Sequence, residues 1–103
     1  METEHIYQVD LHQKERSYET RIFKIPHPRG TNTIVKMTYR AYNASESFRV
    51  ETLVNFSWNP LISMEDLGYF PDSTIYIKNP EERKERANEL IENALELVNS
   101  LLF

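Results

Sequence analysis

The C-terminal quarter of the chain repeats its apolar residues at spacings of three and four positions, which is the period of an α-helix. These positions are Ala87, Leu90, Ile91, Ala94, Leu95, Leu97, Val98, Leu101 and Leu102. At about 100° per residue they span an arc of roughly 160°. An apolar stripe of this width is stable in water only when another layer covers it, so the rest of the chain must supply that layer.

The beginning of this helix is marked by its own residue types. Asn79 suits an N-cap and Pro80 suits the first helical position. Glu81 and Glu82 follow in the first turn, where the helix dipole favours acidic side chains. The solvent side is predicted to carry Glu85, Glu89, Glu92 and Glu96.

Four segments predict the covering layer, because apolar and polar residues alternate along them as in half-buried antiparallel strands. The segments are Ile6–Leu11, Tyr18–Ile25, Thr33–Tyr42 and Phe48–Trp58. In the first, Tyr7, Val9 and Leu11 fall on one side. A turn is expected at 12–16, and a loop at 27–32 because of its proline and glycine.

Two readings stay open for the connection between the third and fourth strands. A four-residue loop at 43–46 pairs Tyr39 with Val50, but it sets Arg40 opposite Arg49. A six-residue loop at 43–48 pairs Arg40 with Glu51 instead, and opposite charges across a strand pair are favourable. We prefer the six-residue loop.

The stretch after the fourth strand is expected to be irregular. Asn59-Pro60 is expected to break the strand, because proline cannot donate to a sheet ladder. Leu61–Leu67 is expected to form a helical turn that Gly68 ends, and Thr74–Ile77 a short edge strand. The predicted fold class is α+β: a four-stranded antiparallel sheet, five-stranded if the edge strand joins it, with one C-terminal amphipathic helix packed on one face.

Composition limits both the architecture and the chemistry. With 103 residues, 40% of them hydrophobic and 27% charged, residues 1–103 are expected to form a single globular domain. The chain has no cysteine, which excludes disulfides and thiolate metal sites. The N-terminal ten residues lack a basic and apolar leader, and no run of eighteen apolar residues occurs, so a soluble cytoplasmic protein is expected.

Known catalytic patterns are missing from the sequence. Only Gly30 and Gly68 are present, too few for a phosphate-cradling loop, and no serine has nucleophile-elbow glycines. His5, His12 and His27 lack metal-ligand spacing and are expected to be surface or turn residues. We therefore expect a non-enzymatic protein with no catalytic residue, cofactor or metal ion.

Charge is unevenly distributed along the chain. Residues 16–49 hold seven basic and two acidic residues, whereas residues 50–103 hold four basic and ten acidic ones. The net charge of −4 therefore hides a basic middle and an acidic end. Two hypotheses about function follow from this distribution and from the apolar stripe.

The first hypothesis is a small regulatory protein that binds another protein, in the manner of the inhibitors that phages and mobile elements carry. Its contact surface would be an aromatic rim beside the helix, the acidic helix face or the outer face of the sheet. The candidate residues are Trp58, Tyr69, Phe70, Phe103, Glu85, Glu89, Glu92 and Glu96. Ala87, Ile91, Ala94, Val98 and Leu101 also have the spacing of a helix–helix seam, which suggests a homodimer.

The alternative hypothesis is a single-stranded nucleic-acid-binding protein that uses the basic outer face of the sheet. Cationic side chains with a stacking ring on a sheet are typical of such platforms. The candidate residues are Arg21, Arg29, Lys36, Arg40, Tyr42 and Arg49.

Overall fold

Alternation of apolar and polar side chains produces five consecutive antiparallel strands, which lie in the order in which they occur in the chain. The computed structural model describes residues 3–102, and the side chains of residues 3–101. The side chain of Leu102 and all of Phe103, both named in the sequence analysis, lie outside the described residues. The strands are β1 (Glu4–His12), β2 (Arg16–Pro26), β3 (Asn32–Tyr42), β4 (Ser45–Val54) and β5 (Ser57–Ser63).

The two hairpin turns on either side of β4 correct the predicted connections. Asn43 and Ala44 have φ angles of 48° and 61°, so a tight turn joins β3 to β4 and pairs Tyr42 with Ser45. Neither the four-residue nor the six-residue loop is present. Tyr39 lies opposite Phe48 and Met37 opposite Val50, so the apolar sides of β3 and β4 share a face. Trp58, whose alternation places it with Phe48 and Val50, lies on the other face, because the second turn breaks the predicted strand.

The predicted strand Phe48–Trp58 is in fact two strands. Asn55 and Phe56 have φ angles of 50° and 66° and form a second tight turn, after which β5 returns along β4. Pro60 does not end the sheet, because it lies within β5, an edge strand, and edge strands tolerate proline. The register shifts beside it, between Val50 and Glu51.

Residues 64–79 contain two short 3₁₀ helices and no strand. The first, η1 (Glu65–Leu67), matches part of the predicted helical turn and ends at Gly68, whose φ of 82° suits glycine. The second, η2 (Ile75–Ile77), replaces the predicted edge strand. Ile75 is buried in the core, so this segment is held by packing without pairing to the sheet.

The predicted C-terminal helix is confirmed as α1 (Pro80–Leu102). The Asn79 side chain accepts a hydrogen bond from the Glu82 backbone N–H at 2.8 Å, and its amide donates to the Glu82 carboxylate at 3.2 Å. The first bond is the N-cap that the residue types predict, and the second joins the two side chains.

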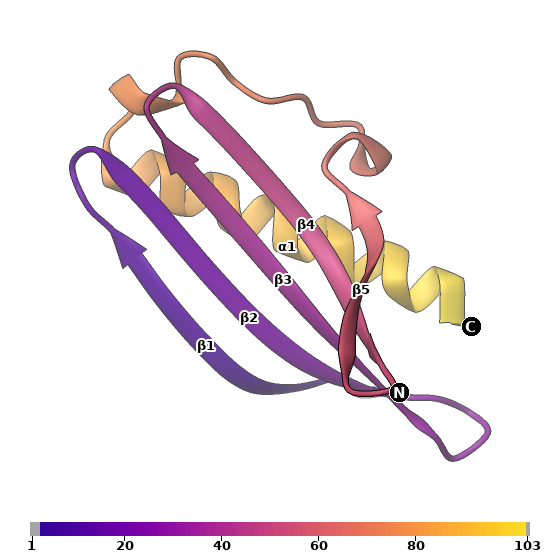
Figure 1. Cartoon of the computed structure of the whole chain (residues 1–103). Coiled ribbons are helices and arrows are strands. Elements are labelled where there is room, and N and C mark those ends of the chain that lie inside the picture. The colour runs from indigo at the N-terminus through magenta and orange to yellow at the C-terminus, as the bar shows by residue number, and fades with distance from the viewer. Residues whose placement is uncertain (1–2, 103) are drawn as a thin grey trace.

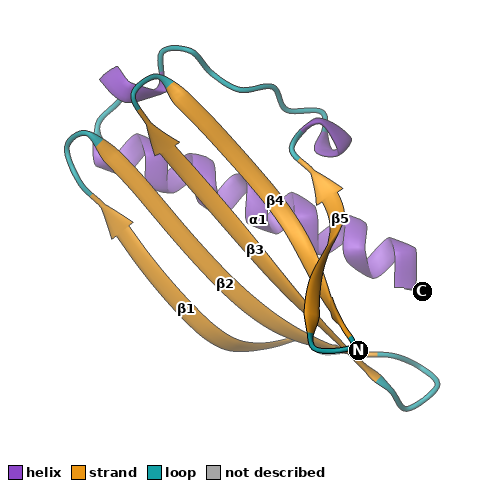
Figure 2. Ribbon diagram, viewed as in Figure 1, coloured by secondary structure: helices purple, strands orange, loops and turns teal. Residues whose placement is uncertain are grey.

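Two layers result, with the sheet in front of α1 in Figures 1 and 2. The helix lies across one face of the sheet, which we call the inner face, and it contacts β1, β2 and β3. The 64–79 segment passes over the same face, where η2 contacts β3 and β4 and η1 contacts β5. The opposite, outer face is covered by no other part of residues 3–102 (Figure 2).

The core lies between these layers and contains the apolar stripe of α1. Its buried apolar residues are Phe23, Ile25, Val35, Met37, Tyr39, Ala41, Phe48, Val50, Ile62, Met64, Ile75, Ala87, Leu90, Ile91, Ala94 and Val98. Four of the five residues of the proposed helix–helix seam are therefore packed within one chain, and only Leu101, 63% exposed, is left. A homodimer cannot use that seam while this fold is intact. Within residues 3–102 no helix is both long and apolar enough to cross a membrane.

Candidate binding surfaces

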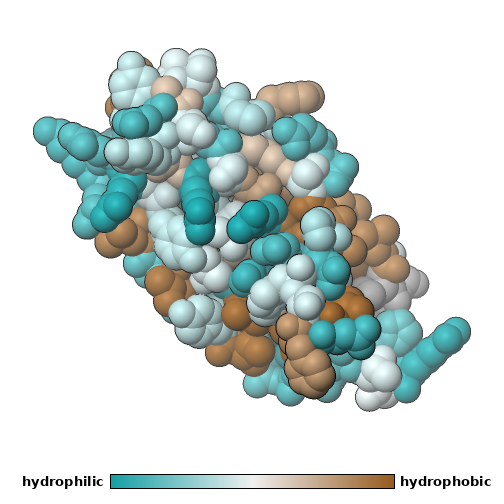
Figure 3. All heavy atoms as spheres, viewed as in Figure 1, coloured by the Kyte–Doolittle hydropathy of each residue, from teal (hydrophilic) through white to brown (hydrophobic). Residues whose placement is uncertain are grey.

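The outer face of the sheet begins at β1 with apolar side chains. Tyr7 lies opposite Ile22, and Val9 and Leu11 continue the row along the same side of β1. Tyr7, Val9 and Leu11 are 50%, 39% and 38% exposed. The alternation of β1 is thus as predicted, but its apolar side faces away from the helix. Figure 3, which views this face, shows hydrophobic residues on the β1 side and near the β4–β5 hairpin, interleaved with hydrophilic ones.

The central strands add cationic and aromatic side chains to the same face. The Arg40 guanidinium lies 5.3 Å from the ring centre of Tyr18, and the Lys36 ammonium lies 4.5 Å from that of Trp58. Glu51 lies between Lys36 and Arg49, at 3.8 Å from the first and 3.5 Å from the second. Since one carboxylate is shared by two cations, the centre of the outer face keeps a net positive charge.

Arg40 lies between two shallow hollows on this face. One hollow, of about 200 Å³, is lined by Arg16, Ser17, Tyr18, Arg40, Ala41 and Tyr42. The other, of about 260 Å³, is lined by Thr38, Arg40, Ser47, Phe48 and Arg49. Each hollow is lined by a guanidinium and by aromatic or hydroxyl-bearing side chains. Such a lining suits the binding of an amino-acid side chain or a nucleic-acid base.

The residues predicted for nucleic-acid binding are only partly brought together. Lys36, Arg40, Tyr42 and Arg49 share the outer face, and Arg29 is exposed in the β2–β3 loop. Arg21 is not with them. Its guanidinium pairs with Glu19 and donates to Asn88 of α1 at 2.5 Å, so it lies on the inner face.

The residues predicted for a protein partner are also divided between two sides. Trp58 lies on the outer face beneath Lys36. Glu85, Glu89, Glu92, Glu96, Tyr69 and Phe70 lie on the helix side. The Tyr69 hydroxyl donates to Glu89 at 2.8 Å, which raises the pKa of Tyr69 above its ordinary value, and it accepts from Asn93 at 2.7 Å. Phe70 is 72% exposed.

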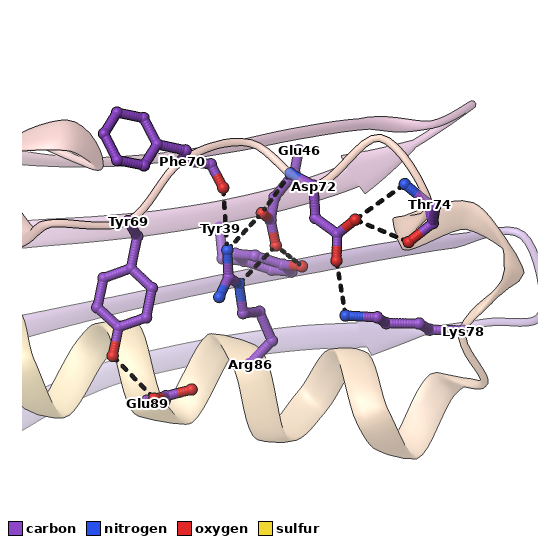
Figure 4. A network of polar contacts seen from close by, with 9 residues as sticks. All are labelled: Tyr39, Glu46, Tyr69, Phe70, Asp72, Thr74, Lys78, Arg86 and Glu89. Atoms are coloured by element: carbon purple, nitrogen blue, oxygen red, sulfur yellow. Dashed lines mark hydrogen bonds and ion pairs between the residues drawn. The ribbon is translucent and has the colours of Figure 1, made fainter.

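A buried carboxylate that the sequence analysis did not single out fixes the 64–79 segment (Figure 4). Glu46 accepts two hydrogen bonds from Arg86, each 2.9 Å, one from the Tyr39 hydroxyl at 2.8 Å and one from the Asp72 backbone N–H at 3.2 Å. These bonds raise the pKa of Arg86, and burial together with the Glu46 charge raises that of Tyr39 well above its ordinary value. Arg86 also donates to the Phe70 carbonyl at 3.2 Å.

A second buried carboxylate joins the first hairpin to the helix. Glu19 is fully buried, forms a hydrogen bond with His12 Nε2 at 2.9 Å, and pairs with Arg21. The His12 side chain is only 8% exposed, so the expectation that every histidine is a surface or turn residue is wrong for His12. The burial of His12 could not be predicted from its place at the end of a strand, because it depends on α1 packing against β1.

The same cluster is where the described residues bring potential metal ligands together. Asp10, His12 and Glu19 place one ligand atom each within 4.8 Å of one another. Glu19 already has His12 on one oxygen and Arg21 on the other, and a guanidinium beside the carboxylate repels a divalent cation. We therefore describe the cluster as an ion-paired element of the fold.

Arg83 forms the third buried polar centre. Its side chain is fully buried, and it donates to Ser17 Oγ at 2.7 Å, to the Lys14 carbonyl at 3.1 Å and to the carbonyls of Gln13 and Lys78. One guanidinium thus satisfies backbone groups of the β1–β2 turn and of the segment before α1. The sequence signal for it was weak, since Arg83 stands in a helix turn rich in charged residues.

Comparison of the chain with protein-family models, with curated proteins and with solved structures found no match. The outer face and the buried polar centres are therefore the features from which a function can be inferred.

Proposed function

We propose that the protein is a non-enzymatic binding protein that uses the outer face of its sheet to engage an acidic surface of another protein. The observation that carries the proposal is that this face exposes Tyr7, Val9 and Leu11 beside Arg40 and Arg49. Aromatic residues and arginine are enriched in protein interfaces and dominate their binding energy.

Aliphatic side chains favour a protein over a nucleic acid as the partner. Val9, Leu11 and Leu53 are each about 40% exposed on this face. They contribute favourably to the free energy of binding only when other apolar groups cover them. The cations of β3 and β4 would then select an acidic rim on the partner and increase the association rate. A small regulator acting in the cytoplasm is consistent with this surface.

Affinity capture from a lysate of the source organism tests the proposal. We expect Arg40→Glu to weaken capture of the specific partner about tenfold or more, because it sets an acid against an acidic rim. Lys84→Glu is the matched control, since it makes the same charge change at an exposed position of α1. Equal capture by wild type and Arg40→Glu would contradict the proposal.

The same experiment distinguishes the acidic face of α1. Glu92→Lys reverses an exposed charge on that face. If Glu92→Lys lost the partner and Arg40→Glu retained it fully, the binding site would lie on the helix. This result would contradict the outer-face proposal.

A second candidate function, single-stranded nucleic-acid binding, is favoured by one specific observation. The hollow lined by Arg16, Tyr18, Arg40 and Tyr42 places two cations beside two rings. Oligonucleotide binding at low salt that weakens steeply as salt rises, and that Arg40→Glu abolishes, would support this function over the first.

A further inference from the structure

The two edges of the sheet differ in how they are protected from pairing with another strand. β5 has seven residues, contains Pro60 and is interrupted by a register shift. Proline and irregular register are common protections of an edge strand. At the other edge, β1 has nine residues, and from Tyr7 to His12 its pairing with β2 is regular.

β1 lacks those protections over its regular part. Tyr7–His12 contains no proline, glycine or lysine, and residues 4–11 are all exposed. Figure 1 shows β1 at the margin of the sheet, and none of the other helices and strands of residues 3–102 runs along its outer side. The backbone N–H and C=O groups on that side are therefore available to another strand.

We propose that β1 pairs antiparallel with β1 of a second copy of this chain, in a register centred on Val9. In this register Tyr7 lies opposite Leu11 of the second copy and Val9 opposite Val9, all on the outer face. Gln8 lies opposite Asp10, and an amide can donate to a carboxylate. The strand is thus complementary to itself under a two-fold axis, which a closed dimer requires.

Neighbouring registers are less favourable. Side chains that lie opposite each other must share a face, so the centre can move only by whole residues along the strand. Centring on Asp10 sets two Asp10 carboxylates against each other. Centring on Gln8 extends the pair to Ile6, where the register of β1 is already interrupted.

The pairing would extend the binding surface without using the helix. The apolar rows of the two copies would meet along β1, so the two outer faces would adjoin. A single strand pair forms a small interface, and interfaces below about 1,200 Å² of total buried surface are at the weak end of the range. We therefore expect a dimer whose population depends on concentration.

Cysteine cross-linking tests the register directly, because the natural chain contains no cysteine. Directly opposed residues of an antiparallel pair lie within disulfide reach. We expect Val9→Cys to form a disulfide-linked dimer on mild oxidation. Leu53→Cys is the matched control, since Val9 and Leu53 are 39% and 40% exposed on the same face, but Leu53 is not on an edge strand.

A mixture of two variants checks the direction of pairing. Tyr7→Cys mixed with Leu11→Cys should cross-link faster than either variant alone, because only the mixture brings the two thiols opposite each other. Equal rates for Val9→Cys and Leu53→Cys, or no advantage for the mixture, would overturn the proposed pairing.

Sedimentation of the uncrosslinked protein gives an independent measurement. The average mass of wild type should rise with concentration, and Val9→Lys should abolish the rise by placing two ammonium groups at the two-fold axis. Leu53→Lys should keep it, and far-ultraviolet circular dichroism should show both variants folded. A wild type that stays monomeric at every concentration would contradict the proposal.

Discussion

Glu46 and Arg86 are forty positions apart in the chain and form a bidentate ion pair with both hydrogen bonds at 2.9 Å. Glu46 is the second residue of β4 and its side chain is fully buried, while Arg86 is in the second turn of α1. Because the same carboxylate accepts the Asp72 N–H, the pair links the sheet, the helix and the segment between them. The helix is thus held on one face of the sheet, and the other face is left free.

Breaking this pair is expected to destabilise the fold strongly. Glu46→Gln removes the buried charge that pairs with the partly buried guanidinium of Arg86 and should lower the free energy of unfolding by about 3 kcal/mol. Tyr39→Phe removes only one hydrogen bond to the same carboxylate and should cost about 1 kcal/mol. Urea unfolding of both variants measures the difference, and equal costs would show that the ion pair is not the main contribution.

Arg83 gives a second stability prediction. Arg83→Met removes the donors that satisfy Ser17 and the carbonyls of Gln13, Lys14 and Lys78, and should lower the free energy of unfolding by about 3 kcal/mol. Arg16→Met is the control, because the exposed Arg16 side chain bonds only to the Gln13 side chain, at 3.1 Å, and should cost about 0.5 kcal/mol or less. A loss with Arg83→Met as small as with the control would contradict the assigned role.

Asp72 predicts a pH dependence of stability. The hydrogen bond from Lys78, at 2.7 Å, and those from Thr74 lower the pKa of Asp72 well below its ordinary value of 3.8. The charged form therefore stabilises the fold fully above that ordinary value, and this contribution is lost as the pH falls below it. Because the side chain is 28% exposed, we expect no more than about 1 kcal/mol.

The variant Asp72→Asn measures this contribution. Its melting temperature should be below that of wild type near pH 7, and the gap should narrow toward about pH 2. The same substitution in a Lys78→Met background should have a smaller effect. A gap that is constant over this range would show that Asp72 ionisation does not contribute.

The β4–β5 turn predicts a stabilising substitution. Phe56 has a φ of 66° and is fully exposed, so its ring contributes no packing while its Cβ strains the turn. Phe56→Gly should increase the free energy of unfolding by about 1 kcal/mol. Phe56→Ala removes the same ring but keeps the Cβ, and it should gain much less. Destabilisation by Phe56→Gly would contradict the turn geometry.

The helix stripe predicts opposite outcomes for two neighbouring positions. Leu90 lies on the sheet-facing side of α1 and is fully buried. Leu90→Asp should unfold the protein, because an unpaired carboxylate in the core costs more free energy than so small a fold can tolerate. Glu92→Lys, on the exposed side, should leave the melting temperature within a few degrees of wild type. Equal melting points for the two variants would show that the helix face is misassigned.

The sequence predicted the fold class because its two periodicities are strong. The helix stripe and the N-cap at Asn79 depend on local residue types alone, and both are confirmed. The two tight turns were not predicted, because they lack the glycine that such turns usually contain. They share the pattern Asn43-Ala44-Ser45 and Asn55-Phe56-Ser57: an asparagine and a second residue, both at positive φ, are followed by a serine that begins the next strand.

The surface was harder to predict than the core. Alternation tells which residues share a face but not which face a helix will cover, so Tyr7, Val9 and Leu11 could not be assigned to the outer side from the sequence. Arg21 was expected on that side for the same reason. The buried acids Glu19 and Glu46 look like ordinary surface residues in the sequence, because their burial depends on packing against α1, and the partner of Glu46, Arg86, is forty positions away.

The accessibility of methyl groups to a soluble paramagnetic agent tests most directly that the outer face is open and the helix covers the other one. In a dilute sample, the account predicts that the methyl signals of Val9, Leu11 and Leu53 broaden strongly, while those of Val35, Val50 and Leu90 stay sharp. Sharp signals from Val9 and Leu11, or broadening of Leu90 equal to that of Leu53, would contradict it.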